Sequence, residues 1–312
     1  MSIVTHQVIL HSTEDIAGRL PAESIGCVLA ELPAVAELAI SLSVRHRSTC
    51  RGKRPDWLLR AADVRFVGHD GAILLLEAPT LAQAAPELYR QGEFWPTRPD
   101  GADTGLDLLG DLLAEVATEN PEGENFDAPL LRRLSRFRKV FEGPFDALSL
   151  ITRRYTESTP ASMTRETLAV AEQIWRSTPV PQRVRVVGSL DMLRVSTRTF
   201  ALRLDDGHEI RGVLPDGMAE QCGPLLNRRV LVRGKAVFRP SGRLLRVDAD
   251  TIDLATDESG IWSRMPTTAA GRLDHSQLRK PQGPRSGMSA ILGKWPGDET
   301  DEQISEALEQ LS

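Results

Sequence analysis

Apolar and polar residues alternate in two stretches near the start of the chain. The stretch from Val64 to Leu76 carries apolar residues on both sides of Asp70-Gly71. Because Asp-Gly readily takes the positive φ angles of tight turns, this stretch predicts a two-stranded hairpin. Between Glu37 and Arg47, large apolar side chains stand at every second position. That period predicts a further half-buried strand of the same sheet.

Four other stretches repeat their apolar residues at helical spacing instead. They are residues 80–91, 103–118, 127–141 and 164–176. Proline and glycine residues interrupt the chain between the first three, and Pro179-Val180-Pro181 follows the last one. Together with the strands, these helices predict an α+β domain over residues 1–178.

A second pattern of short strands occupies residues 179–256. Five strands are predicted over 184–193, 199–204, 209–214, 229–238 and 244–252, with a helical connection over 215–226. Three strands, a helix and then a hairpin resemble the order of the oligonucleotide/oligosaccharide-binding (OB) fold, a five-stranded barrel. An SH3-like barrel is the alternative. Gly188 and Gly234 stand inside predicted strands, where glycine is typical of the sharp bends that let a small barrel close.

The periodic pattern ends after the barrel. Residues 257–286 are rich in Pro, Gly, Ser, Thr and basic residues, which predicts a flexible linker. In the tail, residues 287–312, Thr300 and Gln303 have the spacing of a capping box. The apolar residues Ile304, Ala307, Leu308 and Leu311 then follow at helical spacing. An amphipathic helix of this length is not stable alone in water. We therefore expect it to dock on this protein's own surface or on a partner.

The run Ile291-Leu292-Gly293-Lys294-Trp295, followed by acidic residues and this helix, resembles the C-terminal tails of bacterial antitoxins that pair with PIN-domain ribonuclease toxins. The resemblance covers residues 287–312 only. It implies a tail that lies in a groove of the toxin, with Lys294 or Arg285 reaching the toxin's acidic metal site. The compact N-terminal DNA-binding domain of such antitoxins has no counterpart here, so operator binding is not implied. The candidate partner-binding residues are Ile291, Leu292, Lys294, Trp295, Ile304, Leu308 and Leu311.

Charge is distributed unevenly along the chain. Residues 183–254 contain thirteen basic and nine acidic residues, a local balance of +4 in a chain whose net charge is −5. An OB-like barrel with this balance suggests nucleic-acid binding as the alternative function. The residues that would contact phosphates are Arg194, Arg198, Arg203, Arg211, Arg233, Lys235 and Arg239. Such barrels usually add aromatic stacking platforms, and the segment offers only Phe200 and Phe238.

Sequence motifs of catalysis or cofactor binding are missing from the 312 residues. There is no HExxH, GxSxG, GxxxxGK[ST] or GxGxxG, and Cys27, Cys50 and Cys222 lie far apart. We therefore expect no metal, no cofactor and no catalytic residue, although an enzyme whose site is scattered along the chain stays open. No apolar run approaches the roughly 18 residues of a membrane span. The leading interpretation is a cytoplasmic, non-catalytic binding protein of a bacterial toxin–antitoxin system, with no membrane contact.

One helical stretch is itself basic. Residues 132–139 contain four arginines and a lysine, interleaved with apolar residues. The favoured interpretation is an amphipathic surface helix whose apolar side lies in the core. Docking of RNA or of an acidic protein surface is the alternative.

Overall fold

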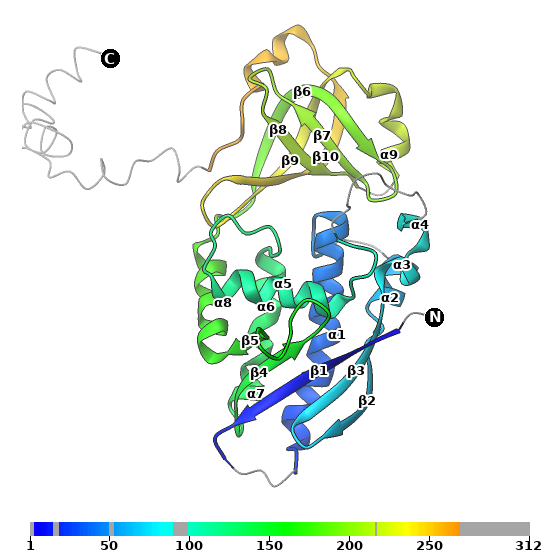
Figure 1. Cartoon of the computed structure of the whole chain (residues 1–312). Helices are drawn as coiled ribbons and strands as arrows, with labels where there is room; N and C mark the ends of the chain where they lie inside the picture. The colour runs from blue at the N-terminus through cyan, green and yellow to red at the C-terminus, as the bar shows by residue number, and fades with distance from the viewer. Residues whose placement is uncertain (1–2, 15–18, 50–52, 90–98, 216, 269–312) are drawn as a thin grey trace, which may run out of the picture. The chain divides into compact units, whose positions relative to one another are not determined.

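The computed structural model describes residues 3–14, 19–49, 53–89, 99–215 and 217–268 (Figure 1). These residues belong to one compact unit, which ends at Thr268. They form an antiparallel sheet with helices, here called the N-terminal domain (residues 3–178), and a closed β-barrel (residues 182–254). The predicted α+β class with a five-stranded barrel is confirmed.

The N-terminal sheet has five strands in the order β2-β3-β1-β4-β5, and neighbouring strands are antiparallel. The strands are β1 (Ile3–Ser12), β2 (Arg65–Asp70), β3 (Ile73–Pro79), β4 (Phe145–Ile151) and β5 (Ala161–Thr164). The predicted hairpin is β2 and β3, and Gly71 in its turn has φ +54°. In the central strand β1, alternate residues His6, Val8 and Leu10 are buried, because one face of the sheet lies on the core.

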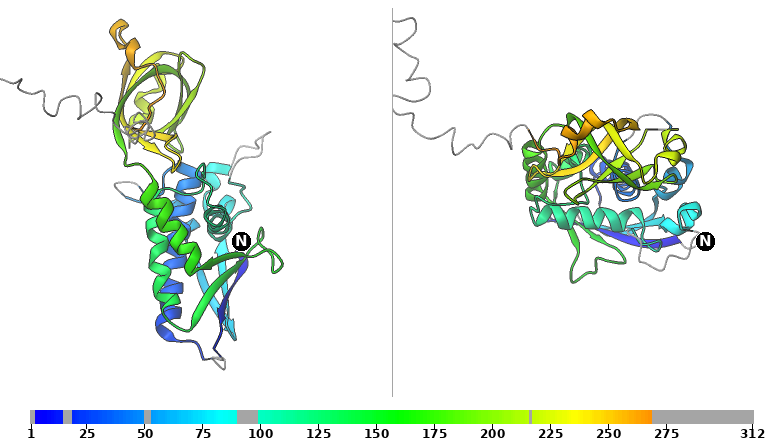
Figure 2. Two further views of the ribbon diagram at one scale, coloured as in Figure 1. Left: turned by 90° about the vertical axis from the view of Figure 1, so that its left-hand side faces the viewer. Right: turned by 90° about the horizontal axis from the view of Figure 1, so that it is seen from above.

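Helices cover one face of this sheet (Figure 2). They are α1 (Ala22–Arg45), α2 (Asp56–Ala61), α3 (Leu81–Ala84), α4 (Pro86–Tyr89), α5 (Gly105–Ala117), α6 (Ala128–Leu134), the 3-10 turn η1 (Ser135–Phe137), α7 (Arg138–Phe141) and α8 (Arg165–Ser177). Each helical stretch expected from the sequence contains helix, although the first and third divide into shorter pieces. α5 begins with a capping box, in which the side chains of Thr104 and Asp107 each accept a backbone N–H from the other residue.

The strand predicted between Glu37 and Arg47 is wrong, because these residues lie in helix α1. The buried residues of α1 include Val28, Leu32, Val35, Ala36, Ala39 and Ile40. Their spacing of three and four residues places them on one helix face. The helical spacing over the whole of α1 therefore determines the structure, and the short alternating pattern at its end does not.

Helix α1 also corrects the expectation about apolar runs. By length and composition alone, it is long and apolar enough to cross a membrane. Half of its most apolar 18-residue stretch is buried inside the structure. A core helix of a globular domain has the same composition. The helix therefore leaves the membrane question open.

The barrel contains β6 (Gln182–Arg194), β7 (Thr199–Arg203), β8 (Glu209–Val213), the short helices α9 (Met218–Gln221) and η2 (Gly223–Leu225), β9 (Arg229–Phe238) and β10 (Leu244–Leu254). The ring order is β10-β8-β7-β6-β9, and β9 closes the ring by pairing with β10. β8 and β10 are parallel, while the other neighbours are antiparallel. The helical connection lies between the third and fourth strands, as expected for an OB-like barrel.

Two glycines allow the barrel strands to approach closely. A Cβ atom at Gly188 would lie 2.5 Å from the carbonyl oxygen of Arg203, and one at Gly234 would lie 2.2 Å from that of Asp248. Real Cβ atoms are not found at these distances from backbone atoms. The structural role predicted for both glycines follows directly from this packing.

Ordered structure continues past the predicted start of the linker at residue 257. Asp257–Trp262 form the 3-10 helix η3, Met265 packs against the barrel core, and Thr268 is buried. Residues 269–312 lie outside the described residues. They include the rest of the predicted linker and the whole tail.

Candidate functional site

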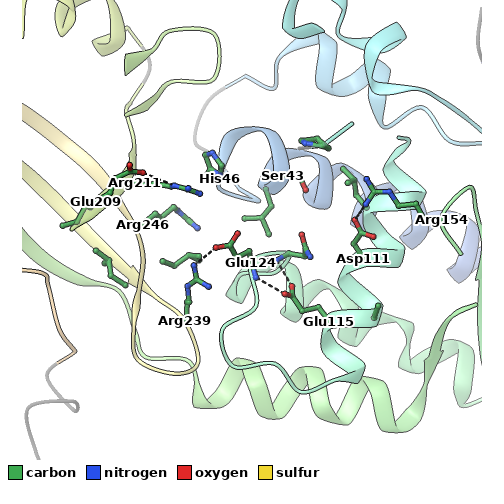
Figure 3. Close-up of a pocket in the computed structure, with 18 of the residues that line it drawn as sticks. Ser43, His46, Asp111, Glu115, Glu124, Arg154, Glu209, Arg211, Arg239 and Arg246 are labelled. Atoms are coloured by element: carbon green, nitrogen blue, oxygen red, sulfur yellow. Dashed lines mark hydrogen bonds and ion pairs between the residues drawn. The ribbon is translucent and has the colours of Figure 1, made fainter. Parts of the chain in front are cut away.

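A cleft of about 1220 Å³ opens between the N-terminal domain and the barrel (Figure 3). We call it the interdomain cleft. Its N-terminal wall includes Leu42, Ser43 and His46 at the end of α1, Leu108, Asp111, Ala114 and Glu115 of α5, and Glu124, Asn125, Arg154 and Tyr155. Its barrel wall includes Glu209, Ile210 and Arg211 of β8, together with Arg239, Leu244, Leu245 and Arg246. The cleft thus combines residues that are far apart in the sequence.

Charged groups on the N-terminal wall are largely engaged with one another. Arg154 forms ion pairs with Asp103 and Asp111, and the hydroxyl of Tyr155 donates to Asp111 at 2.9 Å. Burial raises the pKa of Asp111, and these two partners oppose that shift. Glu115 accepts the backbone N–H groups of Glu124, at 3.1 Å, and of Asn125, at 2.7 Å. It therefore holds the loop that carries Glu124.

The turn between β9 and β10 contacts this same loop. Nη2 of Arg239 lies 2.8 Å from the Glu124 carboxylate, and its Nη1 donates to the backbone carbonyl of Glu122. The backbone N–H of Ser241 donates to the carbonyl of Pro121 at 3.3 Å. Arg243 adds an exposed ion pair with Glu122. The loops that bind ligands in OB folds include the one between the fourth and fifth strands. Here the corresponding loop is docked on the protein's own N-terminal domain.

Arg246 of β10 is the most deeply buried arginine of the cleft, with 7% of its side chain exposed. Its Nε lies 2.8 Å from Asp248, and its Nη2 lies 3.6 Å from Asp127. Its Nη1 has no hydrogen-bond partner among the described residues. Buried guanidinium groups are normally fully hydrogen-bonded, so this free N–H group requires an explanation.

Asp127, the partner of Arg246, also organises the N-terminal domain. It caps helix α6 by accepting the backbone N–H of Leu130 at 3.3 Å. It accepts the backbone N–H of Ser48 at 3.1 Å and the Ser48 hydroxyl at 2.5 Å. One buried carboxylate thus connects a helix start, the segment after α1 and the barrel.

Electrostatic interactions centre on His46 and Glu124. Desolvation lowers the pKa of His46, and the positive charges of Arg211, Arg246 and Arg194 lower it further, against a smaller opposing effect of Glu124. The pKa of Glu124 is lowered by its hydrogen bond to Arg239, and the charges of Arg211 and His46 act in the same direction. Arg211, Arg239 and Arg246 all lie on the barrel side of the cleft (Figure 3).

The seven basic residues proposed to contact nucleic acid do not form one surface. Only Arg211 and Arg239 line the interdomain cleft. Arg203 pairs with Asp191 and Arg233 with Asp253, each on the barrel surface. Arg194 and Lys235 are exposed on β6 and β9, and Arg198 is half-buried at a positive φ. Acidic neighbours therefore neutralise part of the charge that the sequence count suggested.

The two aromatic residues of the barrel are core residues. Phe200 is fully buried and Phe238 is 1% exposed. Neither is available to stack on a base, so the barrel lacks the aromatic platforms that usually accompany single-strand binding.

The basic helical stretch also serves the fold. Leu131, Leu134 and Phe137 are buried, as the favoured interpretation expects. The basic side chains face acidic ones on neighbouring helices: Arg133 and Arg136 pair with Glu31, and Arg138 pairs with Glu172.

Other predicted features fall elsewhere. The candidate tail residues Ile291, Leu292, Lys294, Trp295, Ile304, Leu308 and Leu311 all lie outside the described residues. Within the part that the structure describes, no group of three or more His, Cys, Asp or Glu side chains is placed to hold a metal ion.

Comparisons with family models, curated protein sequences and solved structures gave no match.

Sequence reasoning missed His46, Glu124, Asp127 and Arg246. Arg246 precedes the buried Val247 of β10, so its side chain lies on the outer face of the barrel. An outward-facing strand position is normally exposed, and here the N-terminal domain covers it. No signal in the sequence of a single strand reveals such coverage by another domain.

Proposed function

We propose that this chain is a non-catalytic bacterial binding protein whose tail, residues 287–312, engages a protein partner. The observation that carries the proposal is the tail sequence itself: Trp295 in an apolar run, followed by apolar residues that repeat at the spacing of one helix face. A tryptophan provides a large contact area at a small cost in side-chain freedom. A single stripe on so short a helix requires a surface to lie against.

We further propose that the partner is a ribonuclease toxin of the PIN-domain class, and that this protein neutralises it in the cytoplasm. The resemblance of the tail to PIN-toxin antitoxins supports this class. Lys294 supplies a positive charge beside the Trp295 anchor. An acidic metal site on the partner would complement that charge.

The test compares tagged full-length protein with a version that ends at Ser286. Both are expressed in the native host, purified gently and examined by mass spectrometry for bound proteins. We expect a ribonuclease to be recovered with the full-length chain alone. Recovery of the same partner with both versions, or of none with either, contradicts the proposal.

Single substitutions sharpen this experiment. Trp295→Ala and Leu308→Asp remove the anchor and interrupt the apolar stripe, and we expect each to abolish recovery of the ribonuclease. Glu306→Ala is the matched control, because at helical spacing position 306 falls opposite the predicted stripe of positions 304 and 308. We expect this control to retain the partner.

Nucleic-acid binding through the barrel is the second candidate, favoured by the OB-like strand order. The ion pairs of Arg203 and Arg233 and the burial of Phe200 make it the weaker one. Its test is retention of a single-stranded oligonucleotide by the full-length protein, measured over a range of salt concentrations. Retention at low salt that falls steeply as salt rises would support it, and no retention at low salt would remove it.

A further inference from the structure

The barrel wall of the interdomain cleft contains two arginines beside one another. Gly212 of β8 is the register partner of Val247 of β10 in a parallel pair. The preceding residues, Arg211 and Arg246, are therefore cross-strand neighbours on the same face. Like charges in this relationship repel each other and destabilise a sheet, unless an anion lies between them.

Three carboxylates engage this pair but leave some of its N–H donors free. Asp248 and Asp127 engage Nε and Nη2 of Arg246, while Nη1 is left without a partner although the side chain is 7% exposed. Among the described residues, Arg211 pairs with Glu209 on its own strand, at 3.4 Å, and 60% of its side chain is exposed. One buried N–H group and one accessible guanidinium thus remain to receive a ligand.

Residues on the opposite wall favour the same kind of ligand. Desolvation and the charges of Arg211 and Arg246 lower the pKa of His46, so its imidazole offers an N–H donor rather than a positive charge. On the same wall, the carboxylate of Glu124 is already paired with Arg239, whose side chain is 17% exposed.

We propose that the interdomain cleft binds a small phosphorylated molecule, with one phosphoryl group between Arg211 and Nη1 of Arg246. A phosphoryl group presents several acceptor oxygens and can bind two guanidinium groups at once. The volume of about 1220 Å³ exceeds that of inorganic phosphate, so the remainder of the cleft accommodates an organic or second phosphoryl part. This site uses no tail residue and is independent of the proposed partner.

Inorganic pyrophosphate is the probe for the test. Isothermal titration calorimetry at low ionic strength measures its binding to the full-length protein and to Arg211→Gln. Loss of a charge-assisted hydrogen bond is expected to weaken binding by about tenfold or more. Arg233→Gln is the matched control, because Arg233 is 51% exposed on β9, pairs with Asp253 and does not line the cleft. We expect less than about a threefold change for this control, since it removes only a distant exposed charge.

Arg211→Gln is chosen because an exposed side chain can be changed without unfolding the barrel, and the unfolding midpoint of each variant verifies this. No binding by the wild-type protein overturns the proposal. Equal weakening in both variants also overturns it, since it would mean a general charge effect. Binding of citrate as tight as that of pyrophosphate would contradict the phosphoryl class. Binding of an unphosphorylated oligonucleotide in place of pyrophosphate would assign the arginines to nucleic acid instead.

Discussion

Nη2 of Arg246 lies 3.6 Å from Oδ2 of Asp127, and both side chains are almost completely buried. Asp127→Ala removes this contact, the cap of α6 and the hydrogen bonds to Ser48. We expect the free energy of unfolding to fall by about 3 kcal/mol, because a helix cap is lost and a buried guanidinium loses one of its two carboxylates. Urea unfolding monitored by circular dichroism measures the change.

Arg243→Ala is the control for that measurement. It removes an ion pair with Glu122 that also joins the barrel to the N-terminal domain, but whose side chains are exposed. We expect a change of no more than about 0.5 kcal/mol. If both substitutions had equal effects, the buried pair would have no special part in holding the two domains together.

Gly234→Ala tests the closure of the barrel. The new methyl group would lie 2.2 Å from the carbonyl oxygen of Asp248, so strands β9 and β10 must separate locally. We expect a loss of about 2 kcal/mol or more in the free energy of unfolding. Gly26→Ala is the control, because nothing lies within 4 Å of the added atom in helix α1. There we expect a gain of about 0.5 kcal/mol, since alanine favours the helix. A destabilisation of similar size at both positions would contradict the packing argument.

Local patterns predicted the barrel well, because its strands are bounded by turn residues and paired largely with a sequence neighbour. Gly207 and Gly242, in the turns between its strands, both have positive φ angles. Helix α1 was not recognised from the sequence, because Pro33 interrupts its apolar pattern. Its last residues also happen to alternate between large apolar and other side chains, as in a strand. Strand β1 was not predicted, because its buried residue His6 is polar and Val8, Ile9 and Leu10 are consecutive apolar residues, so the sequence does not show the period of a strand.

The candidate site was less accessible to sequence reasoning than the fold. Counting basic residues pointed to the barrel, but the count does not reveal that Arg203 faces Asp191 or that Arg233 faces Asp253. These pairs depend on strand register. The proximity of Arg246 to Asp127 depends on how two domains meet, which no local pattern encodes. The tail prediction stays untested, because its residues lie outside the described ones.

The burial of His6 predicts that the protein loses stability on mild acidification. Its side chain is 1% exposed, its Nε2 lies 3.1 Å from the hydroxyl of Thr104, and burial lowers its pKa in spite of the nearby charge of Asp107. The unfolded chain, with an ordinary histidine pKa, therefore binds more protons than the folded protein as the pH falls below about 7. The free energy of unfolding should decrease from pH 7.5 to 5.5. His46 contributes in the same direction, because its pKa is also lowered.

Urea unfolding of His6→Asn at both pH values isolates the contribution of His6. Asparagine can still bond to Thr104 but does not titrate, so we expect a smaller decrease between pH 7.5 and 5.5 than in the wild-type protein. The raised pKa of Asp111 acts in the opposite direction in both proteins, and its contribution therefore cancels in the comparison. Gln7→Asn, at a non-titrating position of the same strand, is the control and should keep the wild-type pH dependence. An unchanged pH dependence in His6→Asn would mean that the buried imidazole does not set it.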